Sequence, residues 1–312
     1  MMRYGLPYKG SKNSIAKWIV DELPPAEVFC DLFFGGGAVT HRAILSGKYK
    51  RFIANDIDAR LPVLFKDCAY GKYTVENHQE WITRDEFNQR KDDDAYIALV
   101  WSFGNNGKDY LYGKEIEDIK HAYHNAVYKG DIKALEPYGY KLTLSNAKTI
   151  YGRYLDYQRQ LQSQNMLEVE TRQNEIERLQ SLQSLQSLQS LQSLQSLQSY
   201  GCDYQAVEIP ANALIYCDIP YNSTNCGKYQ GFDHERFYEW AREQDNIYIS
   251  EYTMPPDFIP YARIEKTVLS AATGNNIKTD ECIFTNAKTY EKLSKSKQEY
   301  AKLNFAEQMS LF

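Results

Sequence analysis

The tetrapeptide Asp218-Ile219-Pro220-Tyr221 places an acid, a proline and an aromatic ring directly after an apolar run at residues 213–217. The run is predicted to be a buried strand, and open α/β sheets bind ligands at the carboxyl ends of such strands. There, a carboxylate and the backbone carbonyls beside a proline can accept hydrogen bonds from an amine, and a tyrosine ring can stack on a flat heterocycle. The pattern predicts a site that holds the exocyclic amino group of a nucleobase, with its lone pair facing an electrophile.

A plainer interpretation of the same four residues is that the proline only ends the strand. Asp followed by Pro is common at that position, because proline cannot continue a ladder of backbone hydrogen bonds. The chemical interpretation therefore requires a second pocket elsewhere in the chain, for a cofactor that carries the electrophile.

A glycine-rich turn supplies a candidate for that pocket. Residues 28–34 form a predicted strand, Gly35-Gly36-Gly37 follows, and a helix is expected over 38–45. Glycines let a ligand approach the backbone, and the helix N-terminus offers unpaired N–H donors. Asp56 ends the next predicted strand, 52–56, where an acid can bind both ribose hydroxyls of a nucleoside. This βαβ unit predicts a parallel sheet and a nucleoside cofactor, without distinguishing a dinucleotide from S-adenosylmethionine.

A second acid and ring, Asp203-Tyr204, precede the strand at 213–217. The carboxylate can accept from the amino group of a cofactor adenine, and the ring can cover that base. The alternative is an aspartate that only shapes a turn, which is a frequent role for this residue type.

In their order along the chain, these motifs resemble the Dam-type (D12 class) DNA adenine-N6 methyltransferases. The resemblance rests on residues 8–12 (Tyr-Lys-Gly-Ser-Lys), 31–37, Asn55-Asp56, Asp203-Tyr204 and Asp218–Tyr221, and residues 279–286 resemble the last core strand of that family. It covers about residues 3–60 and 200–286. Ile219 departs from the family pattern, which usually has proline there.

The resemblance implies a Rossmann-like, S-adenosylmethionine-dependent methyltransferase sheet of the α/β class, with an inserted, mainly helical target-recognition region. We expect the catalytic domain at residues 1–70 and 201–290, the inserted region at 71–200, and a C-terminal tail from 291. The implied activity is site-specific transfer of a methyl group to N6 of adenine in double-stranded DNA, with the base flipped out of the duplex.

Specific site residues are implied in the same way. Tyr8 and Lys12 would lie over the methionine part of the cofactor; Phe33, Gly35 and Gly37 would line its pocket, with Asp31 at the entrance; Asp56 would bind ribose, and Asp203 and Tyr204 the cofactor adenine. Asp218 and a carbonyl near Ile219–Pro220 would hold the target amino group, and Tyr221 would stack on the target base. Asn105, Asn106 and Lys108 lie in a loop where such enzymes contact DNA.

The middle of the chain carries a repeat. Leu-Gln-Ser occurs seven times in succession over residues 179–199, and neither Gly nor Pro occurs from Arg153 to Tyr200. At about 100° per residue, leucines three apart wind around an α-helix, while a 3₁₀ helix would align them but is rarely long. We expect one long helix, or a helical hairpin, containing a repeat helix at 179–199. Its role is either that of a surface tract or that of a rod for self-association.

Other elements follow from apolar spacing and terminators. Helices are expected at 14–23, capped by Asn13 or Ser14 and ended by Pro24-Pro25, and at 59–70, 115–129 and 233–243; strands are expected at 247–250 and 281–285.

Composition narrows the class of protein. The chain has 312 residues and a net charge of −5, so any DNA contact must be a local basic patch. It has no apolar stretch suited to a bilayer and no secretory signal at its start, so a cytoplasmic protein is expected. None of the six cysteines forms a Cys-x-x-Cys pair, which favours free thiols. His121 and His124 lack further ligands, so no metal is expected.

Three alternatives remain open from the sequence. A nicotinamide-dependent oxidoreductase would use the glycine turn and Asp56, but would leave Asp218–Tyr221 unexplained. A methyltransferase acting on cytosine N4, RNA or a protein glutamine would keep the same chemistry. A non-catalytic DNA-binding or assembly protein could be built on a degenerate methylase core. The recognised DNA sequence and any restriction partner are not encoded in a readable pattern.

Overall fold

The computed structural model describes residues 3–163, 175–189, 191–221, 231–269, 276–295 and 297–301. The chain divides into two compact units. The first comprises residues up to Asn13 and Val63–Ser190; the second comprises Ser14–Pro62 and the chain from Leu191 onward. Helix α3 (Arg60–Ala69) crosses from the second unit into the first. Of the expected C-terminal tail, the structure describes residues 291–295 and 297–301.

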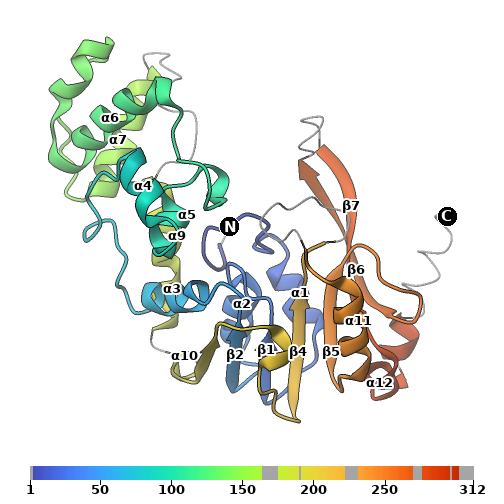
Figure 1. Ribbon diagram of the computed structural model, residues 1–312. Helices are drawn as coiled ribbons and strands as arrows, with labels where there is room; N and C mark the ends of the chain where they lie inside the picture. Colours follow the sequence, from blue (N-terminus) through green and yellow to red (C-terminus); the bar gives the residue numbers. More distant parts are fainter. Residues whose placement is uncertain are drawn as a thin grey trace. The chain divides into compact units, whose positions relative to one another are not determined.

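A seven-stranded sheet forms the framework of the second unit (Figure 1). Its order is β3-β2-β1-β4-β5-β7-β6. The strands are β1 (Val28–Asp31), β2 (Arg51–Asn55), β3 (Leu197–Tyr200), β4 (Ala213–Asp218), β5 (Ile247–Glu251), β6 (Ile259–Leu269) and β7 (Asn276–Thr285). The first five strands of that order are parallel to one another, whereas β7 is antiparallel to both β5 and β6. Between β1 and β4 the chain order reverses, which makes that gap the topological switch point of the sheet.

The two faces of this sheet carry different side chains, because successive residues of a strand point to opposite sides. One face is apolar and packs beneath helix α11 (His234–Glu243); its buried strand residues include Cys30, Ile215, Cys217, Ile249, Cys282 and Phe284. The register pairs Asp31 with Tyr216 and Asp218 with Ser250, so these polar residues share the other face.

Four helices of the second unit accompany the sheet: α1 (Ala16–Glu22), α2 (Ala38–Ser46), α11, and α12 (Ala287–Glu291). The predictions for α1, α2 and α11 are confirmed in position. The expected cap of α1 is wrong, because the N-cap residue is Ile15 and makes no side-chain hydrogen bond. The Asn13 side chain instead accepts from the Tyr4 backbone N–H at 2.6 Å.

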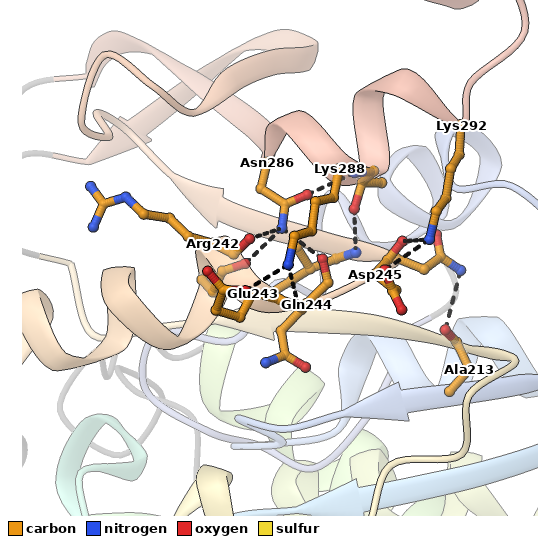
Figure 2. A network of polar contacts seen from close by, with 12 residues as sticks. Ala213, Arg242, Glu243, Gln244, Asp245, Asn286, Lys288 and Lys292 are labelled. Carbon is orange, nitrogen blue, oxygen red and sulfur yellow. Dashed lines mark hydrogen bonds and ion pairs between the residues drawn. The ribbon is translucent and has the colours of Figure 1, made fainter.

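Asn286 fixes the C-terminal end of α11 (Figure 2). Its side-chain amide donates to the carbonyls of Ala241 and Gln244, at 2.7 and 2.8 Å, and more weakly to that of Arg242. Its own oxygen accepts from the Thr289 N–H and caps α12. These bonds satisfy carbonyls that a helix end leaves unpaired, and so they hold α11 in place on the sheet.

The described part of the first unit is mainly helical. Its elements are α4 (Arg84–Arg90), α5 (Ala95–Val100), η1 (Phe103–Asn105), η2 (Lys114–Ile116), α6 (Glu117–Lys129), η3 (Ile132–Tyr138), α7 (Ile150–Ser163), α9 (Glu175–Gln183) and η4 (Ser184–Leu188). Helix α4 begins with a reciprocal cap, in which Thr83 and Glu86 each accept from the other's backbone N–H. Helix α6 confirms the prediction for 115–129.

The Leu-Gln-Ser tract is not one helix, so the expectation of a repeat helix over 179–199 is wrong. The α-helix α9 gives way to the 3₁₀ segment η4, then to the short helix α10 (Gln192–Gln195) and the strand β3. The physical reason is the period of three: a 3₁₀ turn aligns leucines that an α-helix would spread around its axis. The leucines at 179, 182, 185, 188, 194 and 197 are all buried.

The last triplet belongs to the sheet. Leu197 pairs with Phe52 as β3 runs parallel to β2, and the strand is an edge of the sheet. The described part of the tract is therefore packed within the structure rather than forming a surface insertion, and six of its leucines are buried. Self-association through residues 153–200 stays a prediction.

None of the helices in the described ranges is both long and apolar enough to cross a membrane. The cysteines that the structure describes, at 30, 68, 202, 217 and 282, are free thiols; Cys226 lies outside the described residues.

Candidate active site

The predicted site residues of the second unit gather at the switch point of its sheet. Asp31 ends β1 and Asp218 ends β4, the two adjacent strands that flank the reversal (Figure 1). Asp31 pairs with Tyr216, so Asp218 lies two residues further along β4 and on the same face. Two carboxylates therefore stand on one face at the edge where open α/β sheets bind ligands.

The glycine turn after β1 adopts a backbone that side chains would obstruct. Gly35 and Gly37 have positive φ, +49° and +67°. A Cβ at Gly37 would lie 2.2 Å from the Phe34 ring, and the Gly37 N–H donates to the Phe34 carbonyl at 2.7 Å. The turn leads directly into α2, whose N-cap is Gly37. Glycine at 37 is thus required both by the conformation and by the packed ring.

Asp56 lies against this turn, as the sequence predicts. It is buried, and its Oδ2 accepts from the Gly35 N–H at 2.7 Å. Its Oδ1 accepts from the Asp58 N–H at 2.9 Å. The acid that directly follows β2 therefore holds the glycine turn in shape through its hydrogen bond to Gly35.

Asp31 is buried and only half satisfied. Its Oδ2 accepts from the Thr40 hydroxyl of α2 at 2.7 Å, whereas its Oδ1 has no hydrogen-bond partner among the described residues. Burial raises the pKa of the Asp31 carboxyl to about 7. The charges of Asp218 and Asp56 act in the same direction, whereas hydrogen bonding by the Thr40 hydroxyl and the Phe33 backbone N–H opposes the shift. A buried acceptor without a donor is unfavourable by itself, and a cation placed beside Oδ1 would relieve it.

Asn55 joins the second acid and ring to the turn. Its side-chain amide donates to the carbonyls of Leu32 and Cys202, both at 3.1 Å, and its oxygen accepts from the Cys202 N–H at 3.2 Å. This bridge places Asp203 and Tyr204 next to the residues that follow β1. The rings of Tyr204 and Phe33 lie 5.4 Å apart.

Tyr204 belongs to an aromatic cluster on the apolar face of the sheet. Its ring contacts those of Phe237 and Trp240 at 5.5 and 5.0 Å, and Phe33 contacts Phe237 at 5.7 Å. Burial raises the pKa of the Tyr204 hydroxyl to about 12. The cluster provides an apolar wall of a kind on which an adenine can pack.

The Asp203 carboxylate is engaged by Arg236 of α11. The guanidinium donates to both carboxylate oxygens, at 2.8 and 3.2 Å, and to the Gln205 side chain at 2.7 Å. It also lies 5.5 Å from the centre of the Tyr204 ring. The pKa of Asp203 is lowered, although burial opposes the shift, because the Gln205 N–H and Arg236 stabilise the charged form.

The Pro220 carbonyl accepts from Nε2 of His234, the first residue of α11, at 2.8 Å. A carbonyl can only accept, so this contact fixes the proton on Nε2. The Pro220 carbonyl therefore has a hydrogen-bond partner within the protein. The preceding carbonyl, that of Ile219, is the other candidate to accept from a target amino group.

Tyr221 is held at two points. Its hydroxyl donates to the Glu281 carboxylate on β7, and its ring meets the Tyr252 ring edge-on, with centroids 4.5 Å apart. Glu281 is fully buried. Burial raises the pKa of the Tyr221 hydroxyl far above its ordinary value, and the charges of Asp218 and Glu281 add to the shift. The tyrosine therefore remains a hydrogen-bond donor at physiological pH.

Five predicted site residues belong to the first unit: Tyr8, Lys12, Asn105, Asn106 and Lys108. Lys12 is buried, and the Tyr8 carbonyl accepts from the Ser11 N–H. Asn105 has a positive φ of 57° and donates to the Leu99 carbonyl at 2.9 Å.

The oxygen of Asn106 accepts from the N–H groups of Lys108 and Asp109, which tightens the loop after Ser102. The roles of the five first-unit residues stay predictions.

Sequence reasoning missed several contributors: Thr40, Asn55 as a bridge, His234, Arg236 and Glu281. Asn55 and Glu281 lie within motifs that the sequence already shows, Asn55-Asp56 and residues 279–286. The other three residues lie on helices α2 and α11, and only the fold brings them to the edge of the sheet.

The comparison with known families agrees with this geometry. The D12 class N6 adenine-specific DNA methyltransferase family matches residues 8–251 of the chain, and the chain belongs to that family. No curated protein sequence matched the chain. The resemblance drawn from the motifs is confirmed, and the seven-stranded α/β sheet is consistent with a methyltransferase. The protein is an enzyme that methylates adenine at N6 in DNA, which sets the oxidoreductase alternative aside.

Within the described ranges, no group of three or more His, Cys, Asp or Glu side chains is arranged to hold a metal ion.

Proposed function

We propose that the protein transfers the methyl group of S-adenosylmethionine to N6 of an adenine flipped out of double-stranded DNA, with Asp218 holding the target amino group. The observation that carries this proposal is the pair of acids, Asp31 and Asp218, on one face of the sheet at the switch point. One acid lies at the glycine turn and the other at the base-binding motif, so a donor and an acceptor of the methyl group would meet between them.

The residues at the turn fit the proposed cofactor. S-adenosylmethionine, when bound, supplies an electrophilic methyl group on a positively charged sulfonium and also carries an ammonium group. The buried Oδ1 of Asp31 has no hydrogen-bond partner among the described residues, and such an acceptor suits a cation. Gly35 and Gly37 supply the positive-φ backbone of the turn that leads into α2, and the Phe34 ring fills the position of a Cβ at Gly37.

The nucleoside part of the cofactor would occupy the neighbouring groups. Asp56 would accept from the ribose hydroxyls, because its carboxylate lies beside the glycine turn at the end of β2. Tyr204 and Phe33 would pack on the adenine, and Asp203 would accept from its amino group. Arg236 orients that carboxylate and keeps it ionised. Tyr8 and Lys12 are proposed to cover the methionine part.

On the target side, Asp218 and the Ile219 carbonyl would accept the two N6 hydrogens. We assign the second acceptor to Ile219 because the Pro220 carbonyl is bonded to His234. Accepting both hydrogens reduces conjugation of the nitrogen lone pair with the ring and aims it at the methyl group. Orientation of this kind can supply roughly 7–11 kcal/mol of a reaction barrier, and flipping costs a few kcal/mol of unstacking.

Recognition of DNA would fall to the part of the predicted inserted region (71–200) that belongs to the first unit, residues 71–190. Asn105, Asn106 and Lys108 lie in a loop that its own hydrogen bonds hold in shape, and amide and ammonium groups are suited to base edges and phosphates. We propose this loop as a DNA contact of the enzyme.

The decisive experiment separates binding from transfer. Asp218→Ala is expected to bind S-adenosylmethionine in calorimetry as the wild type does and to transfer no methyl group to DNA from cells lacking other adenine methylation. Asp245→Ala removes a carboxylate that is 73% exposed at the end of α11 and serves as the matched control, with wild-type transfer expected. Full transfer by Asp218→Ala would refute the assignment, and modified-base sequencing of the DNA product would identify the methylated adenines.

A further inference from the structure

Glu281 lies on the face of the sheet that carries the proposed chemistry. Ser250 pairs with Asp218 on one side and with Ile283 of β7 on the other. Glu281, two residues from Ile283 along β7, therefore shares the face of Asp218. It is a fully buried acid within an antiparallel strand that the proposed methyl transfer does not use directly.

A buried acid of this kind needs a donor, and Tyr221 provides one. The tyrosine hydroxyl donates to Oε1 of Glu281, while the Tyr252 ring meets the same ring edge-on, with centroids 4.5 Å apart and the ring planes at 62°. A tyrosine ring that stacks on a base can move in two ways: it can rotate about its side-chain torsions, and it can slide along the base. The hydrogen bond restrains the far end of the ring and the aromatic contact restrains its plane.

We propose that Glu281 is a positioning residue of the methyl transfer, which acts by holding the Tyr221 ring in the plane that receives the target adenine. This inference rests on the proposed function. It gives strand β7 a part in binding the target adenine, in addition to its place in the core of the sheet.

The test is a double-mutant cycle on steady-state kinetics and on base flipping. Tyr221→Phe keeps the ring and removes its hydroxyl; Glu281→Gln keeps the shape of the acid and weakens the acceptor. Each is expected to lower kcat/KM for DNA by about 10- to 100-fold, the range for a lost hydrogen bond to a charged group, with an unchanged Kd for S-adenosylmethionine. The double variant is expected to be no worse than the poorer single variant, because both changes break the same contact.

The second readout follows the base itself. The duplex carries 2-aminopurine in place of the target adenine, at the site that modified-base sequencing of wild-type product identifies. Both single variants are expected to change the fluorescence of the bound duplex. The matched control is Tyr49→Phe, which lies just before β2 and removes a hydroxyl bonded to the Pro24 carbonyl between α1 and β1. It is expected to leave kinetics and fluorescence at wild-type values.

Independent, multiplicative losses in the double variant would overturn the proposal, as would wild-type kinetics in Glu281→Gln. If Glu281→Gln fails to fold, Tyr221→Phe decides alone: wild-type kcat/KM and fluorescence in that variant would show that the hydrogen bond positions nothing. Failure of the proposed function is distinguishable, since the wild-type protein would then methylate no DNA.

Discussion

The carboxylate of Asp56 accepts a hydrogen bond from the Gly35 backbone N–H over 2.7 Å, so the acid proposed to bind ribose also holds the glycine turn. Asp56→Ala is therefore expected to lose detectable binding of S-adenosylmethionine in calorimetry. It is also expected to lower the free energy of unfolding by about 1–3 kcal/mol, because two backbone donors lose their acceptor. Urea denaturation measures the second effect.

Asp245→Ala is the control for this change, since it removes an exposed acid paired with Lys292. Its unfolding free energy should stay within about 0.5 kcal/mol of the wild type. An Asp56→Ala protein that binds the cofactor normally would remove Asp56 from the site and leave it a structural role.

Two glycines at opposite ends of α2 separate conformational strain from steric overlap. Gly47, the C-cap, has φ +69° and open space around its Cα, whereas a Cβ at Gly37 would meet the Phe34 ring at 2.2 Å. Gly47→Ala is expected to lose roughly 1–2 kcal/mol of unfolding free energy from the left-handed backbone alone. Gly37→Ala should lose about 1–3 kcal/mol more from overlap, together with cofactor binding. Equal losses in thermal melts would contradict the packed arrangement of Phe34.

The raised pKa of Asp31 predicts a pH dependence with a definite sign. The folded state prefers the protonated carboxyl, whose pKa is about 7 against an ordinary value of 3.8. Its contribution to stability is therefore complete below about pH 4 and is lost as pH rises toward 7. Relative to the wild type, Asp31→Asn should gain unfolding free energy between pH 5 and 7, by up to about 1.4 kcal/mol per pH unit, and the difference should level off above pH 7.

Binding of a cationic ligand should show the opposite trend, because it requires the ionised carboxylate. The affinity of the wild type for S-adenosylmethionine is expected to rise from pH 6 to pH 8 with release of a proton, which calorimetry in buffers of different ionisation enthalpy detects. A pH-independent affinity that Asp31→Asn reproduces would show that Oδ1 does not face the cation.

The central strands and the site motifs could be predicted from the sequence because they are local patterns. Residues 28–31 and 213–218 are short apolar runs that end in acids, and a parallel sheet places such ends on one edge. The alternation of side chains then determines that Asp31 and Asp218 share a face once the register is known. The glycine turn and Asp56 followed from the same reasoning.

The parts that could not be predicted depend on contacts distant in the chain. Arg236 and His234 appear in the sequence as ordinary residues at the start of an amphipathic helix, and only docking of α11 brings them to Asp203 and Pro220. The structure of the Leu-Gln-Ser tract does not follow from its sequence, because a uniform repeat predicts a uniform helix. Burial of its leucines instead favours a change of helix type and then the strand β3.

Arg178 gives a test of how the first unit holds its proposed DNA loop. The guanidinium is buried and donates to the carbonyls of Val100 and Ser102, at 2.7 and 2.6 Å, where the loop begins. Arg178→Met is expected to lower the unfolding free energy by about 2–5 kcal/mol, because two buried carbonyls lose a charged donor. It is also expected to weaken DNA binding at temperatures where the protein remains folded.

Arg153→Met is the matched control. The Arg153 guanidinium donates to the Val127 and Tyr128 carbonyls at the end of α6 and is only partly buried, so a smaller loss of stability and unchanged DNA affinity are expected. Fluorescence anisotropy with a labelled duplex measures the affinity, and equal weakening by both variants would show that the loop gains no special support from Arg178.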